Sequence, residues 1–304
     1  MREVFYLLKR NILVFLRDYT AVFFSFLSML IVLGLMVIFL GSMNSENLVS
    51  ILAEVGGERD ITRDKANAEY LIQMWTLAGI LVVNAVTVTL TVVGAMVEDE
   101  AKNKLASFFV APVKRIKIAL GYIGSAWMVG VMMCVLTLVC GEIYMVVSGH
   151  PLLIFVDFVK LFGMIGLNVF VYATIGYLLA LCVHSQSAWG GMLTIVGTLV
   201  GFLGAIYLPM SQLPENVGNV LKCLPILHGA AMMRQVCTEA AIAETFAGLP
   251  DMAGEMFKEQ MGITIMMNDK AITLQNQILF LALCGIIAIV VAAVVDRRRK
   301  LRDR

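Results

Sequence analysis

The sequence predicts an all-α, polytopic membrane protein: one domain of 304 residues with six transmembrane helices, an N-terminal interfacial helix, a charged cytoplasmic helix and outer re-entrant helices. Three observations support this fold class. The chain is 60% hydrophobic and 15% charged, its mean hydropathy is +0.88, and its apolar residues gather in six long runs. Ordinary soluble domains are much more polar.

The six apolar runs approach the length of about 20 residues that a helix needs to cross the hydrocarbon core of a bilayer. An even number of crossings places both termini on the same side of the membrane. The predicted spans are Val22–Gly41, Leu71–Met96, Ile118–Val147, Leu153–Val183, Ala188–Leu208 and Ile278–Val295.

The distribution of charge orients these spans. Lys and Arg gather near the N-terminus, between the second and third spans, and in the C-terminal tail, whereas the loops 42–70 and 209–277 hold more Asp and Glu than Lys and Arg. Because basic residues are biased toward the cytoplasm, we predict a plasma-membrane protein with both termini in the cytoplasm.

Residues 1–18 predict an amphipathic helix before the first span. Arg2, Lys9, Arg10 and Arg17 are available to lipid headgroups, as is typical of a helix lying in the membrane interface. A cytosolic helix packed on a partner is the alternative. The apolar face consists of Val4, Phe5, Leu8, Ile12 and Phe15.

Residues 97–117 form a charged island between the second and third spans and predict a short helix that Pro112 ends. One face of this helix would carry Leu105, Phe108 and Phe109. Acidic residues near its start would favour the helix dipole; they are Glu98, Asp99 and Glu100. Such a helix either docks into a groove of a soluble partner or only covers lipid headgroups.

Two polar residues within the apolar runs are candidates for a transport pathway. Asn84 lies in the second span, where it either lines a pathway or joins two helices by a hydrogen bond. Glu142 lies near the outer end of the third span, where it either pairs with Lys160 or serves a substrate.

The fifth span carries a stripe of glycines. Gly197, Gly201 and Gly204 fall on one helical face together with Gly190. Small residues at this spacing let helix backbones approach closely in membranes, so we expect this face to pack against another span or a second copy of the chain.

The long outer segment 209–277 begins with three prolines among apolar residues. The prolines interrupt helices, so residues 209–237 predict a pair of short helices that dip into the membrane from outside. Cys223 and Cys237 could form a disulfide there if that side is oxidising. Residues 238–277 predict a small outer cap, with Met252, Met256, Phe257 and Met261 on one helical face.

Several kinds of active site are missing from the sequence. The chain has no G-x-x-x-x-G-K-[ST] phosphate-binding loop, no H-E-x-x-H and no G-x-S-x-G. We therefore expect no ATPase domain, no metal site, no cofactor and no nucleic-acid partner in this chain.

The order of these elements resembles the ABC-2 type permeases, the membrane subunits of bacterial ABC exporters. Two segments carry the resemblance. Glu98–Lys117 is similar to the family's inner coupling helix and reads E-x-x-x-x-L-x-x-x-x-x-x-P-x-x-R from Glu100 to Arg115. Pro209–Arg234 is similar to its outer re-entrant helices. The chain departs from the family pattern at Asn103-Lys104, where Gly-Thr is usual, and in its longer cap.

The resemblance implies a homo- or heterodimer of permease subunits, with spans two and five near a central pathway. It also implies two separate ABC ATPase subunits, which bind ATP and Mg. The docking residues would be Glu98, Glu100, Leu105, Phe108, Phe109 and Arg115.

Two other classes of function stay open. A self-contained carrier or channel would place acids or histidines in mid-membrane to carry coupling ions, and the centres of the spans hold none. A membrane scaffold or sensor that transports nothing is compatible with the same spans.

Overall fold

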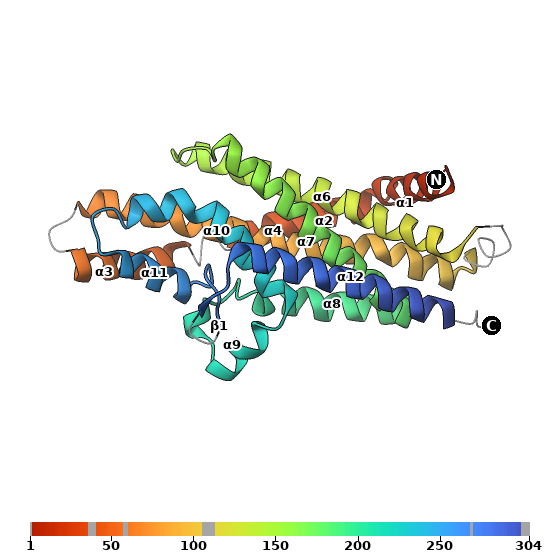
Figure 1. The fold of residues 1–304 in the computed structure, drawn as a ribbon. Coiled ribbons are helices and arrows are strands. Elements are labelled where there is room, and N and C mark those ends of the chain that lie inside the picture. The colour runs from red at the N-terminus through yellow and green to blue at the C-terminus, as the bar shows by residue number, and fades with distance from the viewer. Residues whose placement is uncertain (1, 36–40, 57–59, 105–112, 268–269, 299–304) are drawn as a thin grey trace.

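The computed structural model describes residues 2–35, 41–56, 60–104, 113–267 and 270–298, and these are almost entirely helical (Figure 1). The all-α fold class is thus confirmed. In chain order the elements are α1 (Arg2–Arg17), α2 (Tyr19–Leu35), α3 (Gly41–Gly56), α4 (Ile61–Ala101), α6 (Arg115–Val147), α7 (Phe155–Cys182), α8 (Gln186–Leu203), η2 (Met210–Gln212), α9 (Glu215–Leu221), α10 (Pro225–Thr245), α11 (Asp251–Gln260), β1 (Met266–Met267), β2 (Lys270–Ala271) and α12 (Leu274–Arg298).

Helix α4 is the centre of the bundle. It is 41 residues long and contacts α3, α6, α7, α8 and α10. Its most apolar window is 78% buried, whereas the corresponding window of α8 is only 17% buried. The apolar surface of α8 therefore faces lipid or another subunit, because exposing that much apolar surface to water would cost free energy.

Within the described residues, five helices are long and apolar enough to cross a membrane: α4, α6, α7, α8 and α12. The predicted first span is not shown. Helix α2, which is 17 residues long, covers its first part as far as Leu35, and residues 36–40 lie outside the described part of the chain.

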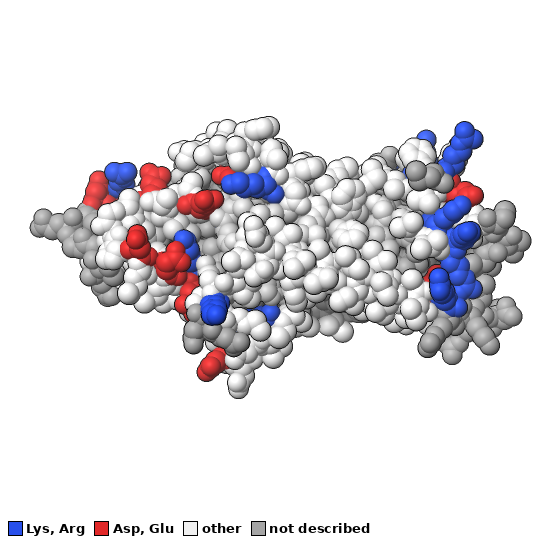
Figure 2. Space-filling view, viewed as in Figure 1, with Lys and Arg blue, Asp and Glu red and all other residues white. Residues whose placement is uncertain are grey.

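The helices extend beyond the spans at the end opposite to the termini. There α3, the first part of α4, α10 and α11 form a lobe (Figure 1), and Leu48 and Leu52 of α3 are fully buried in it. On the face shown in Figure 2, acidic residues gather on this lobe and basic residues gather at the end with the termini. This is the charge asymmetry on which the predicted orientation rests.

The prolines of the outer segment begin helices, because a missing N–H and a fixed φ are harmless at a first turn. Pro209 and Pro214 precede η2 and α9, and Pro225 is the first residue of α10. The predicted pair of short helices ending near Cys237 is wrong in its second member. Helix α10 continues past Cys237 and runs for 21 residues, since no glycine or proline lies between Cys237 and Gly248.

One further expectation about the outer segment needs correction, and the open question of a disulfide is answered. Met252 and Met256 of α11 are exposed, while Phe257 and Met261, the residue after its end, are buried, so the four side chains do not share a face. A step of one residue turns a helix by about 100°. Both Cys223 and Cys237 are free thiols in the structure, the former exposed and the latter buried.

Candidate functional site

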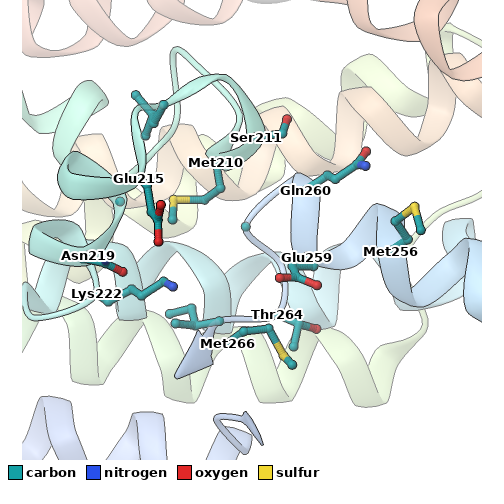
Figure 3. Close-up of a pocket in the computed structure, with 14 residues that line it drawn as sticks. Met210, Ser211, Glu215, Asn219, Lys222, Met256, Glu259, Gln260, Thr264 and Met266 are labelled. Carbon is teal, nitrogen blue, oxygen red and sulfur yellow. The ribbon is translucent and has the colours of Figure 1, made fainter. Parts of the chain in front are cut away.

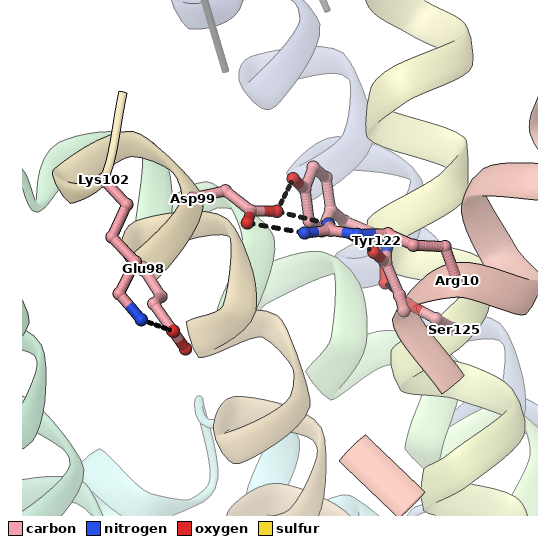
Figure 4. A network of polar contacts seen from close by, with 7 residues as sticks. Arg10, Glu98, Asp99, Lys102, Tyr122 and Ser125 are labelled. Atoms are coloured by element: carbon pink, nitrogen blue, oxygen red, sulfur yellow. Dashed lines mark hydrogen bonds and ion pairs between the residues drawn. The ribbon is translucent and has the colours of Figure 1, made fainter. Parts of the chain in front are cut away.

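A cluster of charged side chains joins three helices at the end of the bundle that carries the termini. Arg10 on α1 forms a two-pronged ion pair with Asp99 on α4, in which Nη2 donates to Oδ1 at 2.7 Å and Nη1 donates to Oδ2. The hydroxyl of Tyr122 on α6 donates to the same Oδ2 at 2.6 Å (Figure 4). Asp99 is only 3% exposed, so these partners replace water around its carboxylate. We call Arg10, Asp99 and Tyr122 the inner triad.

Three further contacts surround the inner triad. Lys117 at the start of α6 forms an ion pair with Glu3 of α1, and Lys102 forms one with Glu98 one turn earlier in the chain. The guanidinium of Arg115 donates to the backbone carbonyl of Asp296 on α12. Helices α1, α4, α6 and α12 are therefore tied together at the two helix ends that flank residues 105–112.

The charges of this cluster stabilise one another. The hydrogen bond to Asp99 raises the pKa of Arg10 above its ordinary value, against the effect of burial. The hydrogen bond from Lys117 lowers the pKa of Glu3. Arg10 thus stays charged at every physiological pH, and the inner triad is suited to holding helices together and not to transferring protons.

The acidic residues of the charged island occupy the end of a helix, not its start. Glu98, Asp99 and Glu100 lie in the last turns of α4, which ends at Ala101. The apolar pattern of the second span continues without a breaker to Val97, so the helix continues with it, and the positive φ of Asn103 (56°) follows its end. Because a helix C-terminus disfavours carboxylates, the partners Arg10 and Lys102 offset their charge.

The predicted docking residues are only partly described. Glu98, Glu100 and Arg115 lie at the ends of α4 and α6. Leu105, Phe108 and Phe109 lie outside the described residues, so the predicted aromatic face of segment 97–117 stays a prediction.

Helix α1 packs on α6 and does not lie only against headgroups. A Cβ atom at Gly121 would come within 2.8 Å of Cβ of Leu7, and one at Gly124 within 3.1 Å of a methyl group of Leu8. Two glycines one turn apart thus let α1 approach α6 closely. Sequence reasoning missed this pair, although its spacing was visible.

The described part of the structure thus has a central helix, four further candidate spans and a charged end. The family of ABC-2 family transporter proteins matches residues 59–294, which is most of the chain. The chain belongs to the ABC-2 transporter family. A comparison with curated protein sequences gives no match. The resemblance noted in the sequence is confirmed, and the protein is the membrane component of an ABC-2 transporter, without catalytic activity of its own.

The two polar residues within the spans of this ABC-2 transporter protein have different surroundings. The amide of Asn84 is buried and donates to the hydroxyl of Thr137, which joins α4 to α6. Glu142 does not pair with Lys160, because Lys160 pairs with Asp157 one turn away at 2.8 Å. The backbone N–H of Leu153 donates to Glu142 instead.

The two halves of the glycine stripe of α8 also have different surroundings. Nothing lies within 4 Å of a Cβ atom built at Gly190 or Gly197, whereas one at Gly201 would meet the ring of Tyr207 at 2.2 Å and one at Gly204 would meet Ile206. The second half of the stripe therefore packs on the chain's own return loop and not on another span. The first half is open to lipid or to a second subunit.

Sequence reasoning also missed a fully buried arginine in the outer half. The guanidinium of Arg234 on α10 donates to the backbone carbonyls of Ala205 (2.7 Å) and Gly204 (3.3 Å) at the end of α8, and to those of Gly262 (3.2 Å) and Met261 (3.4 Å) after α11. It lies 4.4 Å from the ring centre of Trp75 on α4. We call these contacts the outer clamp.

The outer clamp holds an unusual helix end in place. Helix α8 ends at Leu203, and Ala205 just after it has φ 48°, a conformation that favours glycine. The N–H of Ile206 donates back to the carbonyl of Gly201 at 2.7 Å. Next to the clamp, η2, α9 and α11 line a cavity of about 430 Å³ that carries Glu215, Lys222 and Glu259 (Figure 3). Within the described part of the chain, no group of three His, Cys, Asp or Glu residues could hold a metal ion.

Proposed function

We propose that this protein is the permease subunit of an ATP-driven exporter that moves its substrate by alternating access. Two permease subunits would form the pathway, and two separate ATPase subunits would dock on segment 97–117 at the cytoplasmic end. Membership of the ABC-2 family supports the class. The structural observation that carries the coupling is the inner triad, which ties α1, α4 and α6 beside that segment.

The inner triad explains how a push on the docking segment would reach the membrane. The segment connects the last turn of α4 to the first turn of α6. Since Asp99 and Tyr122 hold both helix ends to Arg10, the ends of α4 and α6 would move together with α1. The open half of the α8 glycine stripe, at Gly190 and Gly197, gives a second subunit room to pack closely.

The basic end of the molecule supports the proposed topology. Lys and Arg gather at the end with both termini and acidic residues gather on the opposite lobe (Figure 2), and the bias of basic residues toward the cytoplasm places that end inside the cell. An ATPase subunit would meet the protein there.

Substitution of Phe108 tests the docking proposal. The ATPase subunit is first identified by co-purification with the wild-type protein, and its affinity is then measured for Phe108→Ala and Leu105→Ala/Phe108→Ala. Truncation of a buried aromatic anchor costs about 2 kcal/mol or more, so we expect at least a tenfold loss of affinity and loss of most coupled transport.

Phe5→Ala is the matched control, because Phe5 is an aromatic residue at the same end and is 62% exposed on α1. We expect it to bind the ATPase subunit like the wild type. Normal association and transport in the Leu105→Ala/Phe108→Ala variant would remove the docking role from this segment.

A further inference from the structure

An apolar groove with one carboxylate lies where α6 and α7 approach their connecting turn, which projects from one side of the bundle (Figure 1). Its volume is about 570 Å³. Around Glu142 it is lined by Val139, Ile143, Val146, Leu152, Phe155 and Phe158.

Glu142 has one oxygen without a partner. The residue is 8% exposed; its Oε2 accepts the backbone N–H of Leu153 at 3.0 Å, while its Oε1 is buried and makes no hydrogen bond. A buried carboxylate oxygen without a donor is costly. The ammonium of Lys160 is held by Asp157, so the structure points to a donor that comes from outside the chain.

Specific contacts hold the connecting turn in place, so the groove is not a gap between loose side chains. The ring of His150 in the connecting turn stacks on Tyr70 of α4, with 4.9 Å between ring centres. The hydroxyl of Tyr70 donates to the carbonyl of Pro151 at 3.5 Å. Together with the bond from Leu153 to Glu142, these contacts fix the turn over the end of α6.

The position of the groove selects a lipid. Glu142 lies five residues before the end of α6 at Val147, which is about 7.5 Å along the helix axis. With the end of α6 at the level of the headgroups, Glu142 would lie at the boundary between headgroups and acyl chains. The side chains of Ile143 and Phe155 are 59% and 78% exposed. On two spans, such a surface faces acyl chains.

We infer that this groove binds a phospholipid with a primary amine in its headgroup, phosphatidylethanolamine. The ammonium would donate a charge-assisted hydrogen bond to Oε1 of Glu142, and an acyl chain would lie along the apolar wall. A trimethylammonium headgroup has no N–H, so phosphatidylcholine cannot satisfy this oxygen. The inference stands apart from the proposed ATP-driven mechanism and requires only that α6 and α7 span the membrane.

Lipid retention by the full-length protein tests the site. The protein is equilibrated in mild detergent with equal amounts of phosphatidylethanolamine and phosphatidylcholine of the same acyl chains, and bound lipid is counted by native mass spectrometry. We expect about a tenfold preference for phosphatidylethanolamine, as a charge-assisted hydrogen bond provides. Glu142→Gln, which keeps an acceptor for Leu153, should abolish the preference. Glu255→Gln, the same change at an exposed ion pair on α11, should keep it.

A second pair of variants tests the acyl-chain wall. Ile143→Trp should fill the groove and reduce retention of phosphatidylethanolamine, whereas Ile287→Trp on α12, at a side chain with the same exposure of 59%, should not. Equal retention of both lipids by the wild type, or an unchanged preference in Glu142→Gln, would overturn the inference. Binding to monomers but not to dimers would also overturn it and would assign the groove to a second copy of the chain.

Discussion

Arg10 and Arg234 each stabilise one end of the molecule, but they do so with different partners. Arg10 pairs with the carboxylate of Asp99 on a neighbouring helix, and its side chain is 30% exposed. Arg234 is fully buried and donates to four backbone carbonyls, with the ring of Trp75 against its face. The described residues give Arg234 no carboxylate partner.

The comparison separates two ways of using the same side chain. A carboxylate partner can be substituted, so the inner triad can be rebuilt by a second substitution. Backbone carbonyls cannot be substituted, and only a planar fork with several donors reaches carbonyls of two segments at once. The outer clamp should therefore depend on arginine itself, and the inner triad on a matched pair.

The largest expected effect comes from Arg234→Met. The substitution removes the donor of the buried carbonyls of Gly204, Ala205 and Gly262, which should lower the free energy of unfolding by about 3 kcal/mol or more. Arg234→Lys should recover less than half of this, because one ammonium cannot serve both segments. Thermal unfolding in detergent, followed by circular dichroism, measures both. Arg63→Met, at a side chain that is 70% exposed, is the control and should change little. Wild-type stability in Arg234→Lys would contradict the need for a fork.

A double-mutant cycle on the inner triad should give the intermediate effect. Among the described residues, Arg10→Met leaves the buried Asp99 with only Tyr122 as a hydrogen-bond partner, so we expect a loss of about 2 kcal/mol, and a similar loss in Asp99→Leu. The double variant should lose clearly less than the sum, with a coupling free energy of about 1–3 kcal/mol. Additive losses would show that the two side chains act independently and would remove the contrast with Arg234.

The smallest effect concerns the exposed ion pair between Glu3 and Lys117. Because the hydrogen bond lowers the pKa of Glu3 from 4.5, its stabilisation is complete above that value and is lost as the pH falls through the lower pKa of the folded state. Glu3→Gln should therefore lower the melting temperature slightly at neutral pH and not at strongly acid pH. A difference that grows with acidification would have the wrong sign for this ion pair.

Hydropathy located the described spans well because long apolar runs and their polar ends are local features. The third and fourth spans were predicted as Ile118–Val147 and Leu153–Val183, and α6 and α7 cover 115–147 and 155–182. Helix α4 was predicted from residue 71 to residue 96 but extends from 61 to 101. An apolar run records only the part of a helix that lies in lipid, so polar extensions of the same helix escape it.

The candidate site was harder to predict because it depends on how distant segments meet. Arg10 and Asp99 are 89 residues apart, and nothing in either segment fixes the rotation of α1 against α4. From the sequence, Arg234 is only one basic residue in a proline-rich segment, and nothing near it in the chain indicates that it is buried. The buried surroundings that decide its role come from α4, the end of α8 and the residues after α11. The family resemblance supplied the transporter family because it used the order of the elements.

Both arginines contact the same helix, since Trp75 and Asp99 are residues of α4. The two residues are 24 positions apart, so a continuous helix of about 36 Å separates the two points at which α4 is attached to its neighbours. We call these points, at Trp75 and Asp99, the two fastenings. If this part of α4 rotated by about 5° around its midpoint, the two fastenings would move by about 1.5 Å each, in opposite directions. Hydrogen bonds do not survive a stretch of that size; the bonds at stake are those from Arg10 to Asp99 at one end and that of the Trp75 indole N–H to the carbonyl of Met261 (2.8 Å) at the other. A small swing of α4 must therefore release the fastenings at both ends or carry α1 and α10 along with it.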